Sequence, residues 1–131
     1  RATGIDSTRL TMLLAVLARR GSIHATDKDV FANAAGGIDA RDPSMDLALA
    51  AAISSATKDT PIDPTISCIG EIGLAGEIRP VPSGQERLQE AAKHGFTRAI
   101  VPKANAPKRG QFGDMEVITV DRLMDALQVA F

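Results

Sequence analysis

The fold of this chain is decided by residues 70–81, which read Gly-Glu-Ile-Gly-Leu-Ala-Gly-Glu-Ile-Arg-Pro-Val. The glycines and the apolar residues beside them predict a strand, a turn and a second strand, so that residues 65–72 and 76–81 form a hairpin. The run that follows, Ser83-Gly84-Gln85-Glu86-Arg87-Leu88, predicts the start of a helix that reaches His94 and ends at Gly95. A hairpin that leads directly into a helix therefore organises the centre of the sequence.

Strands and helices alternate along the rest of the chain. The predicted strands cover residues 30–34, 65–72, 76–81, 97–101 and 115–120. The predicted helices run from Asp6-Ser7-Thr8 to Gly21, from Asp42-Pro43-Ser44 to Ser55, from Gln85 to His94, and from a capping Asp121 to near Phe131. The predicted turns and loops are Gly36-Gly37, residues 60–64 and residues 102–113. This order predicts an α/β layer architecture with a mixed sheet.

Length and composition limit the class of protein. The chain has 131 residues, of which 44% are hydrophobic and 24% charged, and its net charge is -1, so we expect one domain over residues 1–131 and no general attraction to nucleic acid. The single cysteine, Cys68, excludes an internal disulfide and a multi-cysteine zinc site. We expect no membrane partner, because no apolar stretch is long enough to span a bilayer. The first residue is Arg1 rather than methionine, and we expect a fragment of a longer cytoplasmic protein.

Three motifs resemble the proteolytic domain of Lon-type ATP-dependent proteases: the hairpin and its helix, the strand and loop over residues 95–105, and the helix start at Pro43-Ser44. The resemblance covers most of the chain, from the first helix to about Asn105. It implies a Lon proteolytic-domain-like fold, which is also that of the second domain of ribosomal protein S5. In active members the helix start reads Gly-Pro-Ser-Ala-Gly and its serine is the nucleophile. That serine matches Ser44, and Gln85 falls where those enzymes carry the lysine base.

The residues at these positions predict that the peptidase site is degenerate. The amide of Gln85 has no titrating group, and Arg87 is permanently protonated, so neither can accept the serine proton. Lys93 lies eight residues further along the same helix, roughly 12 Å along its axis. Asp42 and Asp46 replace glycines and would put negative charge beside an oxyanion. A different base, such as His24, leaves an active serine peptidase as the alternative.

Cofactor motifs are missing from the sequence. No Gly-x-x-x-x-Gly-Lys-Ser/Thr loop occurs, which argues against a P-loop ATP site in this chain. We interpret the acids of the two N-terminal loops as loop and capping residues without metal-ligand spacing; they are Asp27, Asp29, Asp39, Asp42 and Asp46. We therefore expect neither a cofactor nor a metal ion in this chain.

Residues 76–87 and 90–96 resemble more specifically the inactive Lon-like domain of a family of bacterial DNA-repair ATPases. Members of that family also carry a zinc finger and a RecA-like ATPase core, so the resemblance places zinc, ATP and magnesium in domains absent from this sequence. It further implies a homo-hexameric ring that binds DNA while recombination intermediates are processed by branch migration. A scaffold that assembles the ring without touching DNA is a third hypothesis.

Basic side chains are the candidates for contact with DNA. The chain has no tryptophan or tyrosine and four phenylalanines, so we expect phosphate contacts rather than base stacking. The first candidates are Lys103, Lys108 and Arg109 in the loop after the fourth predicted strand, and the next are Arg79 and Arg87, then Arg19 and Arg20. The alternative for each is an ordinary solvated charge.

Overall fold

A computed structural model describes residues 2–3, 7–25, 32–33 and 42–131. The helices are α1 (Ser7–Arg20), α2 (Asp46–Lys58), α3 (Gly84–Lys93) and α4 (Leu123–Ala130). The strands are β1 (Ala2–Thr3), β2 (Ala32–Asn33), β3 (Ile66–Cys68), β4 (Glu71–Ile72), β5 (Ile78–Arg79), β6 (Arg98–Pro102), β7 (Gln111–Phe112) and β8 (Met115–Val120). In the described residues, the 3-10 turn η2 (Pro43–Met45) precedes α2, and the 3-10 turn η3 (Lys103–Asn105) follows the strand β6. The mixed α/β class is confirmed.

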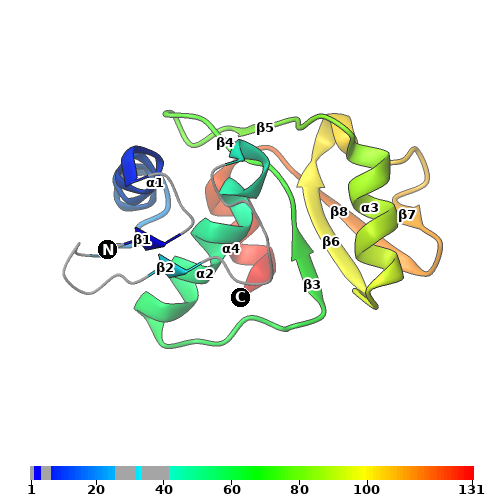
Figure 1. Cartoon of the computed structure of the whole chain (residues 1–131), viewed down its shortest axis with the longest axis horizontal. Coiled ribbons are helices and arrows are strands. Elements are labelled where there is room, and N and C mark those ends of the chain that lie inside the picture. The colour runs from blue at the N-terminus through cyan, green and yellow to red at the C-terminus, as the bar shows by residue number, and fades with distance from the viewer. Residues whose placement is uncertain (1, 4–6, 26–31, 34–41) are drawn as a thin grey trace.

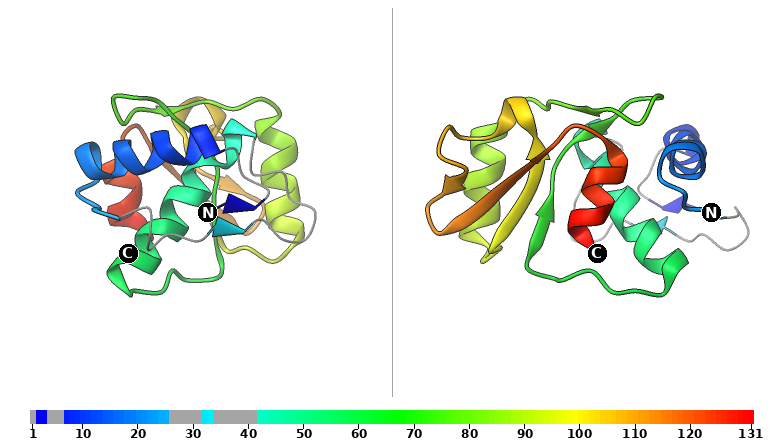
Figure 2. Two further views of the ribbon diagram at one scale, coloured as in Figure 1. Left: turned by 60° about the vertical axis from the view of Figure 1, so that its left-hand side comes forward. Right: turned by 180° about the vertical axis from the view of Figure 1, so that it is seen from behind.

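The main sheet has four strands in the order β3-β6-β8-β7. Its first three strands are parallel, and β7 joins β8 in the antiparallel sense. Figure 1 shows α3 on one face of this sheet and α2 with α4 on the other, and Figure 2 shows α1 beyond α2 on that second side. The hairpin of β4 and β5 lies outside the sheet and runs from the side of α1 toward α3.

Each face of the sheet carries its own apolar core. Alternate residues of a strand point to opposite faces, so Ala99 and Val101 of β6 pack toward α3 while Ile100 packs toward the other helices. Leu88 anchors α3 in the first core, where its side chain is 1% exposed. The second core is larger and joins α1, α2 and α4 through residues such as Leu13 and Leu123. The sheet therefore separates α3 from the three-helix side.

The predicted strand over residues 65–72 is wrong as one element. It divides into β3, which pairs with β6, and β4, which pairs with β5. The break occurs at Gly70, whose N–H donates to the Ser44 carbonyl at 3.1 Å and whose carbonyl accepts from Leu47 N–H at 3.0 Å. Because the start of α2 takes both backbone groups of Gly70, the chain cannot continue in one ladder.

The expected Asp121 cap is also wrong, since α4 begins one residue later with Arg122 at its N-cap and no side-chain cap. The carbonyl of Gly76 fulfils the capping role, because it accepts a hydrogen bond from Leu123 N–H at 2.8 Å. Gly76 has a φ of +80°, and a Cβ there would lie 2.8 Å from Arg20 Cβ. The hairpin turn therefore needs glycine in order to pack between the end of α1 and the start of α4.

The other predictions differ in smaller ways. The strands over residues 97–101 and 115–120 are confirmed as β6 and β8, and α1 and α3 are confirmed within a residue of their predicted ends. The predicted second helix begins as the 3-10 turn η2 at Pro43, becomes α-helical only from Asp46, and extends beyond Ser55 to Lys58. The predicted loop over residues 102–113 contains η3 and β7. The expectations for Asp6, for Gly36-Gly37 and for most of residues 30–34 lie outside the described residues.

Truncation of Leu88 tests the core beneath α3. We expect Leu88→Ala to lower the free energy of unfolding by about 2–5 kcal/mol, because it leaves a cavity in a closely packed layer. Leu74 is 77% exposed at the hairpin turn, so Leu74→Ala is the matched control and should change stability by less than about 0.5 kcal/mol. Urea unfolding followed by circular dichroism measures both, and equal effects would contradict the packing described.

Candidate functional site

Ser44 lies in the turn that starts α2. Asp42 occupies the N-cap position, and its Oδ1 accepts a hydrogen bond from Ser44 N–H at 3.0 Å. This bond, together with the ion pair to Arg87, lowers the pKa of the Asp42 carboxyl below its usual value. The predicted combination of a capping acid with proline at the first helical position is therefore confirmed at Asp42 and Pro43.

The Ser44 side chain is 3% exposed, and its Oγ has no hydrogen-bond partner in the described part of the chain. A serine nucleophile needs a neighbouring group that accepts its proton and a path by which the substrate carbonyl reaches its oxygen. The observed hydroxyl has neither a partner base among the described residues nor an exposed surface. Its geometry is that of a buried residue in a helical turn.

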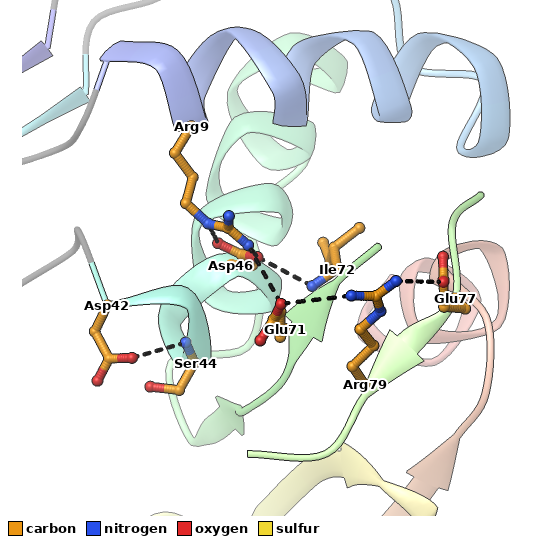
Figure 3. Close-up of polar contacts among 8 residues, drawn as sticks. All are labelled: Arg9, Asp42, Ser44, Asp46, Glu71, Ile72, Glu77 and Arg79. Carbon is orange, nitrogen blue, oxygen red and sulfur yellow. Dashed lines mark hydrogen bonds and ion pairs between the residues drawn. The ribbon is translucent and has the colours of Figure 1, made fainter. Parts of the chain in front are cut away.

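Asp46 lies two residues after Ser44. It was predicted to be a loop or capping acid, but it makes contacts with two other elements of the fold. It is 2% exposed, and both its carboxylate oxygens accept from the Arg9 guanidinium of α1, with the Nε–Oδ1 distance at 2.7 Å. Its Oδ2 also accepts from Ile72 N–H at 3.0 Å. Figure 3 shows the carboxylate between α1 and β4. Arg9 pairs with Asp46 and Arg87 lies 3.4 Å from Asp42, so each acid expected to put negative charge beside Ser44 has a cationic partner.

The ion pairs continue from this carboxylate along the hairpin. Arg9 lies 4.0 Å from Glu71, Glu71 lies 3.9 Å from Arg79, and Arg79 lies 3.1 Å from Glu77 (Figure 3). Arg79 is therefore engaged by two carboxylates of its own hairpin. Although more than half of its side chain is exposed, this pairing weakens it as a free contact for phosphate.

The helix α3 presents Arg87, rather than Gln85, to the Ser44 turn. The Arg87 guanidinium lies 3.4 Å from Asp42 Oδ2 and donates to the Pro82 carbonyl at 2.9 Å. Gln85 is exposed and does not line the groove beside Ser44. The assignment of Gln85 to the lysine position thus stays a prediction.

A groove of about 570 Å³ lies between α3, the start of α2 and the edge strand β3. Ser44 lines it near Arg87, and His94 lines it from the last residue of the α3 region. His94 is seven residues from Arg87, roughly 10 Å along the helix axis, and it makes no hydrogen bond to the Ser44 hydroxyl. Its Nδ1 lies 2.8 Å from the Glu90 carbonyl oxygen. His94 is not among the predicted site residues, although the Glu90–His94 spacing of four residues indicates a shared helix face.

The other candidate bases that the structure describes do not line the groove beside Ser44. His24 and Lys93 are exposed, and neither lines the groove. Asp27, Asp29 and Asp39 lie outside the described residues. Within the described residues no group of three or more histidine, cysteine or acidic side chains could hold a metal ion.

The loop after β6 brings the first set of basic candidates to the surface. Lys103, Lys108 and Arg109 are all exposed, and the described residues include no carboxylate in an ion pair with them. Asn105 fixes the start of this loop, since its Oδ1 accepts from Val81 N–H at 2.8 Å and its Nδ2 donates to the Val81 carbonyl at 2.9 Å. This role of Asn105 was not predicted, because a contact between residues 24 apart leaves no local pattern in the sequence.

The remaining basic candidates, Arg19 and Arg20, are exposed on the last turn of α1. They lie on the three-helix side of the sheet, whereas η3 follows β6 beside α3. The structure therefore does not bring all seven basic candidates into one patch. The loop after β6 is the set with the most accessible charge.

Cys68 lies half-buried on the edge strand β3. Burial raises the pKa of its thiol to about 11, so the group is protonated at neutral pH and is a poor nucleophile. In the described part of the chain, no helix is long and apolar enough to cross a membrane.

Comparison with known families gives the relationship of this chain. The model of the family described as subunit ChlI of Mg-chelatase matches residues 14–105, well over half of the chain. The chain belongs to this family. The match begins within α1 and ends at Asn105, where the Lon-like resemblance of the sequence also ends.

Curated relatives named DNA repair protein RadA are similar over nearly the whole chain. The protein of Escherichia coli (strain K12) is 53% identical over 128 residues, which cover 98% of this chain and 28% of the relative. The proteins of Aquifex aeolicus and Bacillus subtilis are 39% and 40% identical, over 100% and 98% of this chain. The chain thus spans little more than a quarter of the length of these relatives. The resemblance to a segment of this family of bacterial DNA-repair proteins is confirmed.

Loss of the Arg9 guanidinium tests the buried ion pair. We expect Arg9→Met to lower the free energy of unfolding by about 3–5 kcal/mol, because Asp46 would remain buried without its cation. Arg79→Met is the matched control, since it removes an exposed guanidinium, and it should cost less than about 1 kcal/mol. Urea unfolding at neutral pH gives both values, and a similar small loss for the two variants would show that Asp46 does not depend on Arg9.

Proposed function

We propose that this chain is the non-catalytic Lon-like module of a RadA-type DNA-repair ATPase, where it supports assembly of a homo-hexamer and binds DNA without regard to sequence. The work of the parent protein in this proposal is the cytoplasmic processing and branch migration of recombination intermediates. Zinc, ATP and magnesium would bind to a zinc finger and a RecA-like core outside this sequence. The similarity to proteins named DNA repair protein RadA supports the role in repair.

The Ser44 turn supports a module without peptidase activity. The serine hydroxyl is buried and lacks a hydrogen-bonded base among the described residues, and the nearest basic group from α3 is an arginine held by Asp42. A guanidinium stays protonated at any pH the protein would meet, so it cannot take the serine proton. In this proposal, Pro43-Ser44 keeps the helix start of Lon-type proteases but does not act as a nucleophile.

The loop after β6 is the observation that carries DNA binding. Three cations within seven residues are exposed there without a competing carboxylate in the described chain, whereas Arg79 and Arg87 each contact acids. In a ring, six copies of this loop would surround the central opening and create a positive rim, although each chain has a net charge of -1. Phosphate contacts from such a rim would be independent of sequence and weakened by salt.

Charge reversal in the loop tests this proposal. We expect Lys103→Glu with Lys108→Glu to weaken binding to a labelled duplex and to lower the slope of log affinity against log salt by roughly 2, because two phosphate contacts are lost. Lys58→Glu with Lys93→Glu is the matched control, since it makes the same charge change on exposed lysines of α2 and α3. Fluorescence anisotropy from low to moderate salt measures both.

Equal losses for the two double variants would show that only net charge matters and would remove the loop from the DNA site. Absence of duplex binding by the unaltered chain, together with ring-sized particles in light scattering, would favour the scaffold that does not touch DNA. Duplex binding with the loop dependence described supports the main proposal.

Peptidase activity is tested separately, since an active serine peptidase is the alternative. We expect no cleavage of unfolded casein and no labelling by a serine-reactive phosphonate, because Ser44 is buried without a base. Ser44→Ala is the control for any activity observed. Cleavage that disappears in this variant would overturn the non-catalytic proposal.

A further inference from the structure

The strand β3 ends the main sheet and leaves one of its edges open. Ile69 N–H donates to the Ile100 carbonyl at 2.9 Å, so alternate residues of this segment bond to β6 and the intervening ones point outward. The outward groups of Gly70 are taken by Ser44 and Leu47 at the start of α2. The outward N–H of Ile66 donates to the Asp63 carbonyl at 3.1 Å, whereas the outward N–H and carbonyl of Cys68 face no further strand among the described residues. An edge of this kind is a template for another extended backbone.

The open edge forms one wall of the groove of about 570 Å³. Residues 66–69 contribute this wall, α3 forms the opposite wall, and Ser44, Met45 and Ala48 close the end. Apolar side chains cover most of the surface. The Ser44 hydroxyl is an exception, because it lines the groove, is almost fully buried and lacks a hydrogen-bond partner in the described chain. A buried hydroxyl of this kind favours an occupant with polar backbone groups.

The α3 wall carries negative charge. Glu86 and Glu90 both line the groove and are exposed, and the cation that lines it between them, Arg87, is held by the Asp42 carboxylate at 3.4 Å. His94 Nδ1 lies 3.7 Å from Glu90, and because the two side chains are 67% and 63% exposed, this contact is weak. A ligand in this groove therefore meets two carboxylates that basic side chains can pair with.

We propose that this groove binds an extended, basic segment of a partner polypeptide, which adds to β3 as a further strand. The backbone groups of Cys68 would pair with the segment, its apolar side chains would fill the groove, and its lysine or arginine side chains would meet Glu86 and Glu90. The acidic wall repels phosphate, so this surface differs from the proposed DNA contact at Lys103, Lys108 and Arg109. Peptide binding in the groove does not depend on DNA binding by the loop after β6.

A fluorescein-labelled hexapeptide of alternating lysine and valine is the probe. We expect saturable binding in fluorescence anisotropy, and we expect this binding to disappear when the backbone nitrogens that face β3 are methylated, because methylation removes the strand hydrogen bonds and keeps the charge. A hexapeptide of alternating glutamate and valine should not bind. Equal binding of the methylated peptide, or no saturation below millimolar concentration, would overturn the proposal.

Variants of the acidic wall test the charge contribution. We expect Glu86→Gln with Glu90→Gln to weaken lysine–valine binding roughly two- to thirtyfold, the range for two partly exposed ion pairs. Glu116→Gln with Asp125→Asn is the matched control, because these acids are exposed on β8 and α4 and do not line the groove. If both double variants lose the same peptide affinity, the effect comes from net charge alone. That result would contradict the contact of the peptide with Glu86 and Glu90.

Amide hydrogen exchange locates the contact. Addition of the lysine–valine peptide should slow exchange at Cys68 and leave Ile69 unchanged, because Ile69 N–H is already bonded to β6. Unchanged exchange at Cys68 would place the peptide elsewhere. A thymidine oligonucleotide that slows Cys68 in the same way would show that the groove takes nucleic acid, which would also overturn the proposal.

Discussion

The buried carboxylate of Asp46 joins three elements that lie far apart in the sequence. It bonds to Arg9 of α1, to the N–H of Ile72 in β4, and it is itself the first residue of α2. A buried carboxylate is costly unless its charge and its oxygens are both satisfied, so these partners must assemble together. This contact fixes the position of α1 against the hairpin. It also holds the start of α2 where Ser44 and Leu47 bond to Gly70.

The contacts of Asp46 also bear on which surfaces of the domain are free to meet partners. The turn that resembles the nucleophile segment of Lon-type enzymes is occupied by structural contacts on both sides, with Asp42 capping it and Asp46 anchoring it. Charge available to partners lies elsewhere: exposed cations follow β6, and exposed acids line the groove beside β3. Opposite charges on separate surfaces allow one small domain to meet a phosphate backbone and a basic polypeptide without competition between them.

The sequence predicted the elements whose signals are local. The apolar runs of β6 and β8 and the Asp42-Pro43 helix start lie where their composition indicates. The features that it missed depend on contacts between distant residues. Gly70 breaks the long predicted strand because its hydrogen-bond partners lie at the start of α2. Gly76, which is 47 residues before Leu123, takes the capping role at α4 that was predicted for Asp121. The pairing of Asp46 with Arg9 crosses 37 residues, so no local pattern distinguishes this acid from a capping one.

Amide hydrogen exchange at Ile72 tests the central role of Asp46 most directly, because that N–H donates to the carboxylate rather than to a backbone carbonyl. If the carboxylate joins the three elements, Ile72 will exchange only through global unfolding, at a rate similar to that of buried sheet amides such as Ile100. Exchange of Ile72 close to the rate of an unfolded chain, while Ile100 remains protected, would contradict the account.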